Sequence, residues 1–239
     1  MRVLFLLIAV SLTLSSCEFF GGERVYGSGH IVNQQRSIGS FNSVSAGGSM
    51  VIHIRQNPTS SVSIQADDNL MEYIDVYVDG STLVVKPKYG YNLDPSRDIT
   101  VYAAAPSFRE IEVSGSGDVI SDNQISGSGE MHMSVSGSGN IKVDVNLPKL
   151  TTEVSGSGTI AVKGAARDFN ASISGSGDIR CFDLVTDNTS LDLSGAADAE
   201  VTANQKLDVE VSGSGDVKYK GNAAVNQHIS GAGSVRKVG

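Results

Sequence analysis

The chain has 239 residues, with 18 lysines and arginines against 26 aspartates and glutamates, which gives a formal net charge of −8 at pH 7. This acidic balance argues against nucleic acid, or an anionic membrane surface, as a partner. Two cysteines are too few for a disulfide-stapled scaffold. The absence of tryptophan and the scarcity of other aromatic residues leave little material for the aromatic platforms of carbohydrate sites.

The first segment predicts export and lipid anchoring. Arg2 precedes an apolar run of twelve residues, 3–14. A helix of that length rises about 18 Å, less than a hydrocarbon core of roughly 30 Å, so residues 1–16 fit a cleaved signal peptide. Cys17, directly after Ser16, resembles the cysteine of a bacterial lipobox, with cleavage between these two residues. We therefore expect Cys17 to carry the acyl chains, palmitate among them, of an outer-membrane lipoprotein. An ordinary secretory signal with an incidental cysteine is the alternative.

The rest of the chain is expected to form a single domain. Residues 17–26 are assigned to a short tether and residues 27–239 to one all-β domain, which is less regular up to residue 110. No segment after the signal is long and apolar enough to span a membrane.

The less regular part still has the pattern of strands. Apolar and polar residues alternate over 74–78, and Asp79-Gly80 then predicts a hairpin turn. The run "DDNLMEY" from Asp67 predicts either one short helix or a loop. The run "VSAGGSMVI" from Val44 looks like a worn copy of a motif that recurs later in the chain.

From residue 111 onward that short motif recurs. Ser-Gly-Ser-Gly begins at Ser114, Ser126, Ser136, Ser155, Ser174 and Ser212, and degenerate copies begin at Ser194 and Ser230. From Ser136 the steps are 19, 19, 20, 18 and 18 residues, and apolar residues alternate with polar ones on both sides of each copy. One such unit cannot bury its apolar face alone, so neighbouring units must stack. The pattern predicts an all-β fold, a parallel β-helix with coils of roughly 19 residues.

The two glycines of the motif differ in how strictly they recur. The first corner glycine is kept in every copy, as Gly115, Gly127, Gly137, Gly156, Gly175, Gly195, Gly213 and Gly231. The second corner glycine becomes Ala197 in one copy. An alanine at positive φ is penalised by roughly 1 kcal/mol relative to glycine. We therefore assign the left-handed conformation to the first corner glycine and close packing to the second.

The alternation also places the only cysteine of the domain. Cys181 falls in the inward column that contains Val143, Val162, Val201 and Tyr219. A buried, unreactive thiol that packs as a small apolar group is therefore expected.

These residues resemble a known family. The run "VSGSGDV" at residues 113 and 211, with "ISGSGDI" at residue 173, is similar to that of the family "putative auto-transporter adhesin, head GIN domain". So is the pattern Gly27, Gly29, Arg36, Ile38 and Phe41 that leads into "VSAGGSMVIHI". The resemblance covers roughly residues 27–235. It implies a right-handed β-helix of the pectate-lyase-like kind, and an envelope protein, often a lipoprotein, with an adhesive role. It supplies no catalytic residues.

A column of short polar side chains follows the corners. Its members are Asp118, Glu130, Asn140, Thr159, Asp178, Asp198, Asp216 and Ser234. A stacked acidic column could bind calcium, but the calcium β-helix repeat has the form G-G-x-G-x-D with a period of nine, which this chain does not match. We expect these side chains to cap turn amides, and we expect neither a metal site nor a cofactor.

An enzyme is the main alternative function. β-Helices include polysaccharide lyases and hydrolases, which need clustered carboxylates for acid–base chemistry. The candidates are Asp67, Asp68, Asp187 and Asp208, and the histidines are His30, His53, His132 and His228. The regular coils carry scattered rather than clustered carboxylates, and no serine stands in a nucleophile elbow. We therefore predict no catalytic residues and a protein that is not an enzyme.

Charged outward residues favour a binding module. Those before the corner are Glu112, Gln124, Ser134, Glu153, Ser172, Asp192 and Glu210, and those after it are Lys142, Arg180, Lys218 and Arg236, with Glu200 among them. Stacking would turn them into two neighbouring stripes, and repeat surfaces commonly bind extended ligands. The expected partner is a glycan or another host or cell-surface ligand. The alternative is that opposite charges only keep the faces soluble, as in a purely structural envelope scaffold.

Overall fold

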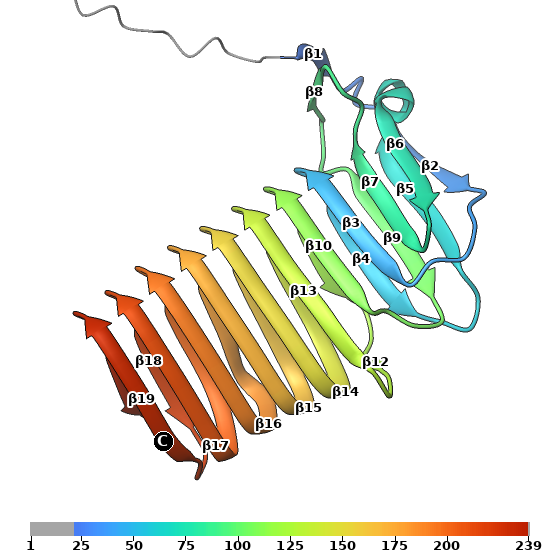
Figure 1. The fold of residues 1–239 in the computed structure, drawn as a ribbon. Coiled ribbons are helices and arrows are strands. Elements are labelled where there is room, and N and C mark those ends of the chain that lie inside the picture. Colours follow the sequence, from blue (N-terminus) through green and yellow to red (C-terminus); the bar gives the residue numbers. More distant parts are fainter. Residues whose placement is uncertain (1–21, 239) are drawn as a thin grey trace, which may run out of the picture.

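The computed structural model describes residues 22–238, most of which lie in β-strands (Figure 1). The predicted signal peptide, with its cleavage and acylation site at Ser16 and Cys17, lies outside the described residues. Within residues 22–238 no helix is long and apolar enough to cross a bilayer.

The elements fall into an N-terminal part and a stack of coils. The N-terminal part consists of β1 (Glu23–Tyr26), β2 (Ile31–Arg36), β3 (Ser43–Gly48), β4 (Val51–Gln56), β5 (Ser61–Asp67), the 3-10 helix η1 (Asp68–Tyr73), β6 (Ile74–Asp79), β7 (Thr82–Pro87), β8 (Tyr91–Asp94) and β9 (Thr100–Ala105). The coils consist of β10 (Glu110–Gly115), β11 (Asp118–Ser121), β12 (Ile125–Ser126), β13 (Glu130–Gly137), β14 (Asn140–Gly156), β15 (Thr159–Gly175), β16 (Asp178–Gly195), β17 (Asp198–Gly213), β18 (Asp216–Lys220), β19 (Ala224–Gly231) and β20 (Ser234–Lys237).

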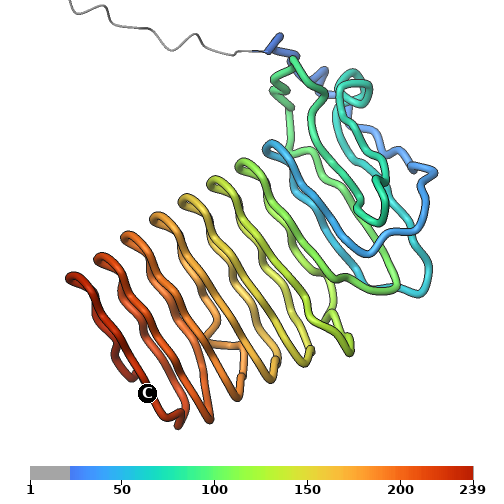
Figure 2. Tube along the Cα trace, in the orientation of Figure 1, coloured from blue at the N-terminus to red at the C-terminus, as the bar shows by residue number. Residues whose placement is uncertain are grey.

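The coils stack in parallel along one axis. Each of β14, β15 and β16 pairs over most of its length with the strand one coil further on, as the successive ribbons show (Figures 1 and 2). Strands β14–β17 have 16 to 18 residues, and each runs from one glycine corner to the next. The stack has about seven turns of about 19 residues, which confirms the predicted parallel β-helix. We call the side formed by segments that lead into a glycine corner the pre-corner face, and the side formed by segments that leave it the post-corner face.

The N-terminal part continues both faces with strands that are out of chain order. On the pre-corner face β10 pairs with β3, β3 with β7, and β7 with β6. On the post-corner face β11 pairs with β4, β4 with β9, β9 with β5, and β5 with β2. The outer pairs β6–β7, β5–β9 and β2–β5 are antiparallel, so the stack ends in antiparallel strands (blue to green in Figure 1).

Several local expectations for this part can be compared with the structure. The predicted hairpin joins β6 and β7 through Gly80, whose φ is 59°. The run from Asp67 contains the short helix η1 rather than a loop. The worn copy of the motif forms a coil, because Gly48 of β3 pairs with Gly115 of β10. The expected tether, residues 17–26, ends in a strand, since β1 pairs in parallel with β8.

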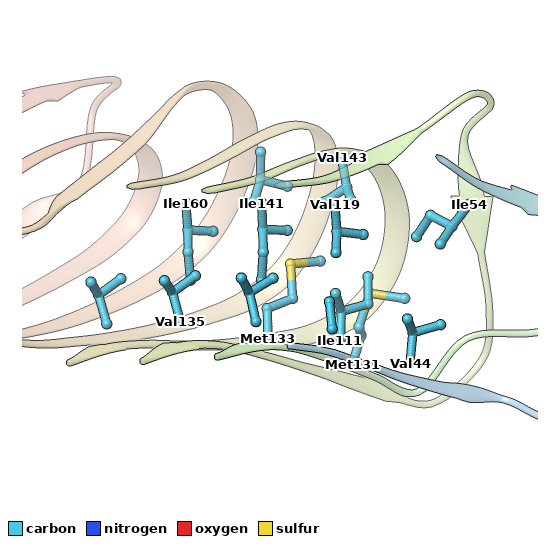
Figure 3. Packing of buried hydrophobic residues seen from close by; sticks show 14 of the residues in the cluster. Val44, Ile54, Ile111, Val119, Met131, Met133, Val135, Ile141, Val143 and Ile160 are labelled. Carbon is cyan, nitrogen blue, oxygen red and sulfur yellow. The ribbon is translucent and has the colours of Figure 1, made fainter. Parts of the chain in front are cut away.

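Two aliphatic rows line the interior on either side of the corners. The row before the corner is Ala46, Val113, Val135, Val154, Ile173, Leu193, Val211 and Ile229. The row after it is Val101, Ile52, Val119, Ile141, Ile160, Ile179, Ala199, Val217 and Val235. Figure 3 shows such side chains directed into the space that the coils enclose. Full burial of one aliphatic side chain is worth about 1.5–3 kcal/mol, so each added coil is stabilised mainly by these rows.

A few polar residues are buried among the described residues, and Thr152 differs from the other buried threonines. Thr152 is fully buried in the register of Met133 and Ala171, and its hydroxyl has no hydrogen-bond partner among the described residues. Thr186 and Thr189 are also buried, but their hydroxyls hydrogen-bond to each other at 2.6 Å. Thr152 is therefore the position at which the core is not optimised for stability.

Candidate ligand-binding face

The corner glycines form one hydrogen-bonded column. In register order they are Gly48, Gly115, Gly137, Gly156, Gly175, Gly195, Gly213 and Gly231. Their φ angles run from 79° at Gly48 to 140° at Gly213, the region that favours glycine. The amide that follows each corner donates to the glycine carbonyl of the preceding coil, as Ser157 does to Gly137 at 2.8 Å. The column fixes the register of the strands on both faces.

One predicted corner glycine lies outside this column. Gly127 has no positive φ and follows β12, because its motif begins only 12 residues after the preceding copy, too few for a coil. Its loop is fixed by Gln56, which donates to the Ser126 carbonyl at 2.9 Å and accepts from the Ser126 amide at 2.8 Å. Gln124, expected in the pre-corner stripe, instead donates to Asp144 at 2.9 Å.

The second corner position faces the interior. It tolerates side chains in two coils, since Ala197 occupies it in one and Met50, in the register of Gly117, in another. Both side chains are buried. A Cβ at Gly158 would nevertheless overlap the Gly139 carbonyl oxygen and the Val135 side chain. The second corner position is therefore restricted by packing rather than by backbone conformation.

Outward side chains form unbroken rows on both faces. The row on the pre-corner face, the acidic row, is Ser45, Glu112, Ser134, Glu153, Ser172, Asp192, Glu210 and His228. The row on the post-corner face, the basic row, is Tyr102, His53, Ile120, Lys142, Ala161, Arg180, Glu200, Lys218 and Arg236. Neighbours in a row lie on strands about 4.8 Å apart. Apart from Gln124, which does not belong to the acidic row, the two expected stripes lie on either side of the corner column.

A first groove crosses the basic row where its side chains are smallest. Ala161 stands between Lys142 and Arg180, and a hollow of about 290 Å³ opens there. Lys163 lines the same hollow and pairs with Asp144 at 3.4 Å. The groove thus combines an aliphatic floor with three cationic side chains and two carboxylates, Asp144 and Asp183. Lys142 has no ion-pair partner among the described residues.

A second groove lies further along the same face. It has a volume of about 320 Å³, and its walls carry Asp178, Arg180, Asp198, Glu200, Asp216 and Lys218. Arg180 bonds to Asp178 at 2.9 Å, and Lys218 lies 3.5 Å from Glu200. These pairs are partly exposed, so each contributes little to stability, and both partners remain accessible to a ligand.

Two of the carboxylates after the corners cap amides of the next coil, while Asp118 and Asp178 accept from the side chains of Asn140 and Arg180. Asp198 accepts from the Asp216 amide at 3.2 Å, and Asp216 accepts from both the amide and the hydroxyl of Ser234. The Ser234 hydroxyl holds the pKa of Asp216 below its ordinary value. Among the described residues, no group of three or more His, Cys, Asp or Glu side chains could hold a metal ion. These hydrogen bonds between neighbouring coils indicate a structural role for the short side chains.

The carboxylates considered for catalysis fall into two separate regions of the fold. Asp67 and Asp68 are at the N-terminal end, at the junction of β5 and η1, whereas Asp187 and Asp208 belong to β16 and β17. Burial by itself raises the pKa of Asp67, but hydrogen bonds from the Ser96 side chain and backbone and from the Gly29 amide outweigh it and lower the pKa.

The other two of these carboxylates with resolved shifts are similarly engaged in structure. The Ser28 hydroxyl lowers the pKa of Asp68, and the Lys206 ammonium lowers that of Asp208. Carboxylates that are held ionised by such partners are poor general acids at neutral pH.

One cluster that the sequence did not indicate lies at the N-terminal end of the basic row. The His53 ring nitrogen Nδ1 is 2.8 Å from Asp122, and its ring stacks on Tyr102 with centroids 5.3 Å apart. Arg55 lies beside them, with Nε 3.9 Å from Asp122. The only signal was the worn motif copy, which aligns His53 with Ile120 and so with the strand that leads to Asp122.

Fold and surface together define a class of protein: a parallel β-helix with charged, grooved outer faces and no assembled catalytic constellation among residues 22–238. The sequence model of the family described as "Putative auto-transporter adhesin, head GIN domain" matches residues 40–223. The chain belongs to this family, as the resemblance of its motifs implied. None of the curated proteins compared with the chain matches it.

Several solved structures have the same fold. A "putative adhesin" from Bacteroides fragilis superposes with a TM-score of 0.85 at 22% identity, over 90% of this chain and 100% of its own. A "putative adhesin" from Parabacteroides distasonis is 27% identical, with a TM-score of 0.75, over 90% of this chain and all of its own. A "putative lipid binding protein" from the same organism is 26% identical, with a TM-score of 0.75, over 91% and 100%.

Proposed function

We propose that the protein is a non-enzymatic adhesin of the cell envelope that binds an extended ligand along its post-corner face. The observation that carries this proposal is the basic row with its two grooves, which continues through successive coils from Tyr102 to Arg236. A linear ligand laid along such a row meets a similar geometry at each coil, so its contacts add up over its length.

The charge of the first groove favours an anionic ligand, whereas the second groove carries four carboxylates against two cations. The first groove brings Lys142, Lys163 and Arg180 together on a chain whose overall charge is negative. These cations lie on one face, while the acidic row lies on the other, so the field is uneven across the corner. An anionic glycan of a host or bacterial surface has the charge and length that this face would complement.

The family supports adhesion as the biological setting. Its description is that of an adhesin head domain, and two of the structural relatives are described in the same way. The N-terminal sequence supports a lipid anchor, because Cys17 is the expected site of acylation. We place the coil stack outside the membrane, tethered by its N-terminal end at the outer membrane.

Incubation of the purified mature domain with pectic, glycosaminoglycan and cell-wall glycans tests this function. We expect stoichiometric retention of at least one class of glycan without any chemical change to it. New reducing or unsaturated ends would contradict the proposal and indicate a polysaccharide hydrolase or lyase. Failure to retain any glycan or to adhere to host or bacterial cells would contradict it too and favour a purely structural scaffold.

A further inference from the structure

The outer surface of the N-terminal part contains a slot that the coils do not have. The basic row continues past His53 and Tyr102 onto the antiparallel strands, where Ser63 of β5 and Gln35 of β2 are next in register. His53 covers one face of the Tyr102 ring. On the opposite side Ser63 is too small to cover the ring, so the next side chain that can form a wall is Gln35, two strands away.

The dimensions of the slot suit one ring. Two strand spacings separate the strand of Tyr102 from that of Gln35 by roughly 10 Å, which leaves room for one ring stacked between the two side chains. The hollow has a volume of about 340 Å³. Ser63, Ser61 and Ala104 form its floor, and Tyr102 is 40% exposed towards it. A floor of small residues between larger walls is a concave site rather than a flat patch.

The walls offer one apolar surface and a polar rim. Tyr102 supplies an aromatic wall that has the His53 ring stacked on its other face, while Gln35, Asn57, Ser61 and Ser63 supply amides and hydroxyls. This distribution matches a pyranose, whose C–H face stacks on an aromatic ring while its hydroxyls bind polar groups around the rim. A flat aromatic ligand would leave most of these polar groups without partners.

Arg55 adds a cation at the edge of the slot. Its side chain is 61% exposed, and its only ion-pair contact among the described residues is the 3.9 Å approach of Nε to Asp122. The two terminal nitrogens are therefore free to bind a carboxylate in a bidentate manner. Asp122 also lines the hollow, where it accepts a hydrogen bond from His53 at 2.8 Å, so a ligand carboxylate would bind the terminal nitrogens of Arg55 rather than the Nε side that approaches Asp122.

The loop that contains the displaced motif copy holds this arrangement in place. Asn123 and Gln56 exchange two hydrogen bonds, from the Gln56 amide at 2.9 Å and to the Gln56 carbonyl at 3.0 Å. Together with the Gln56–Ser126 bonds they fix the backbone on both sides of Asp122. The carboxylate accepts a hydrogen bond only, so Nδ1 of His53 is the donor and the ring is held against Tyr102.

We infer that this slot binds a single carboxylate-bearing sugar ring, a uronic acid, which stacks on Tyr102 and binds Arg55 through its carboxylate. The inference goes beyond the proposed function: the slot shares Tyr102 and His53 with the end of the basic row, but its ligand is one ring held by Tyr102 and Arg55 rather than a chain along the coil grooves. Among the described residues, the His53 ring hydrogen-bonds to Asp122 and to no serine hydroxyl.

Calorimetric titration of the mature protein with galacturonate and glucuronate trisaccharides, and with their neutral galactose and glucose counterparts, tests the inference. We expect saturable uronate binding, at least about tenfold tighter than that of the neutral sugars. Tyr102→Ala should weaken it about tenfold, Tyr102→Phe should leave it within about twofold, and Arg55→Gln should remove the preference for the acid.

Two further variants show whether a loss of binding comes from the slot or from an effect on folding. Ser63→Tyr fills the slot from an outward position and should abolish uronate binding without changing the thermal midpoint. Tyr77→Ala removes a tyrosine of similar exposure, 41%, from the other face and should change nothing. The inference is overturned if no uronate binds saturably, if neutral sugars bind equally well, or if Tyr102→Ala and Ser63→Tyr bind as the unmodified protein does. If the protein binds uronate at the slot but binds no glycan at the two grooves of the coils, only the proposed function is contradicted.

Discussion

At the scale of single residues, the corner requires two small residues for different reasons. The first glycine has a positive φ, 122° at Gly156, and sends its carbonyl to the amide of the next coil. The second, such as Gly158, faces the crowded interior. Both requirements come from stacking, because each would be weaker in a corner without a copy directly before and after it.

Alanine substitution of these two glycines separates the two requirements. Gly156→Ala meets an unfavourable φ and a Cβ 2.5 Å from the Gly137 carbonyl oxygen. Gly158→Ala meets a packing overlap that the coil of Ala197 has accommodated. We expect both to lower the free energy of unfolding, with Gly156→Ala worse by about 1 kcal/mol, in urea unfolding compared at constant m-value.

The corner one coil further on provides a repeat of this comparison. Gly175→Ala and Gly177→Ala should show the same order, since Gly175 has a φ of 130°. Equal losses within each pair, or the larger loss at the second glycine, would show that the backbone conformation of the corner is not what requires the first glycine.

Thr152 permits a stabilising substitution. Its hydroxyl is buried without a partner among the described residues, and valine has nearly the same shape. Thr152→Val should therefore raise the free energy of unfolding by about 1 kcal/mol. Urea unfolding of Thr152→Val and of the unmodified protein, compared at constant m-value, measures this change. A loss of stability in Thr152→Val would indicate that the hydroxyl has a partner, such as a buried water.

At the scale of elements, the coils could be predicted from the sequence, whereas the strand order of the N-terminal part could not. Strands β14–β17 repeat one pattern with a near-constant period, so the glycine positions predict corner and register together. In the N-terminal part β3 and β4 lie between β7 and β9 on one side and β10 and β11 on the other, an order that no local pattern encodes.

The same reason limits what the sequence says about sites. The acidic and basic rows follow from the repeat, because each member stands at a fixed distance from a corner. Gly127 and Gln124 were misplaced because a motif copy alone does not specify a coil when the spacing is 12 residues. The slot was not foreseen, because Gln35, Ser63 and Tyr102 come from three strands that pair across long stretches of chain.

Cys181 tests the register of β16, the coil in which the strand bulges. The pairing of β16 with β17 shifts between Cys181 and Val185, yet Cys181 remains fully buried. Burial raises the pKa of its thiol from 9.0 to about 12. We expect a thiol reagent to label the native protein only as fast as it unfolds, and to label it rapidly in urea. Rapid labelling of the native protein would mean that β16 has a different register.

The same raised pKa predicts a pH dependence with a definite sign. The thiol of the folded protein stays protonated where that of the unfolded chain ionises, so its contribution to stability is complete below about pH 9 and is lost as the pH rises towards 12. Relative to Cys181→Val, the free energy of unfolding should fall over this range. A constant difference between the two proteins would contradict the burial of the thiol.

At the scale of the whole molecule, we expect the proposed lipid anchor at Cys17 to be separable from the stack. Cys17 precedes the described residues, and the strands from β1 onward form the folded domain. Cys17→Ala should move the protein from the membrane fraction to the soluble fraction and leave its thermal midpoint unchanged. Unchanged membrane fractionation would contradict acylation at this residue.

Protease accessibility on intact cells addresses where the stack faces. An adhesin must expose its post-corner face to the outside, so added protease should remove the domain from intact cells. Protection of the domain until the outer membrane is broken would restrict the protein to the periplasm.

The role of the post-corner face is tested most directly by two matched triple variants in the same glycan and cell-binding assay. Lys142→Gln, Lys163→Gln and Arg180→Gln remove the cations of the first groove. Lys149→Gln, Arg167→Gln and Lys206→Gln remove three charges that lie outside both grooves and pair with Glu130, Asp168 and Asp208. The first triple variant should weaken binding at least about tenfold, and the second should bind as the unmodified protein does. Equal binding by both triple variants would contradict a ligand-binding role of the post-corner face.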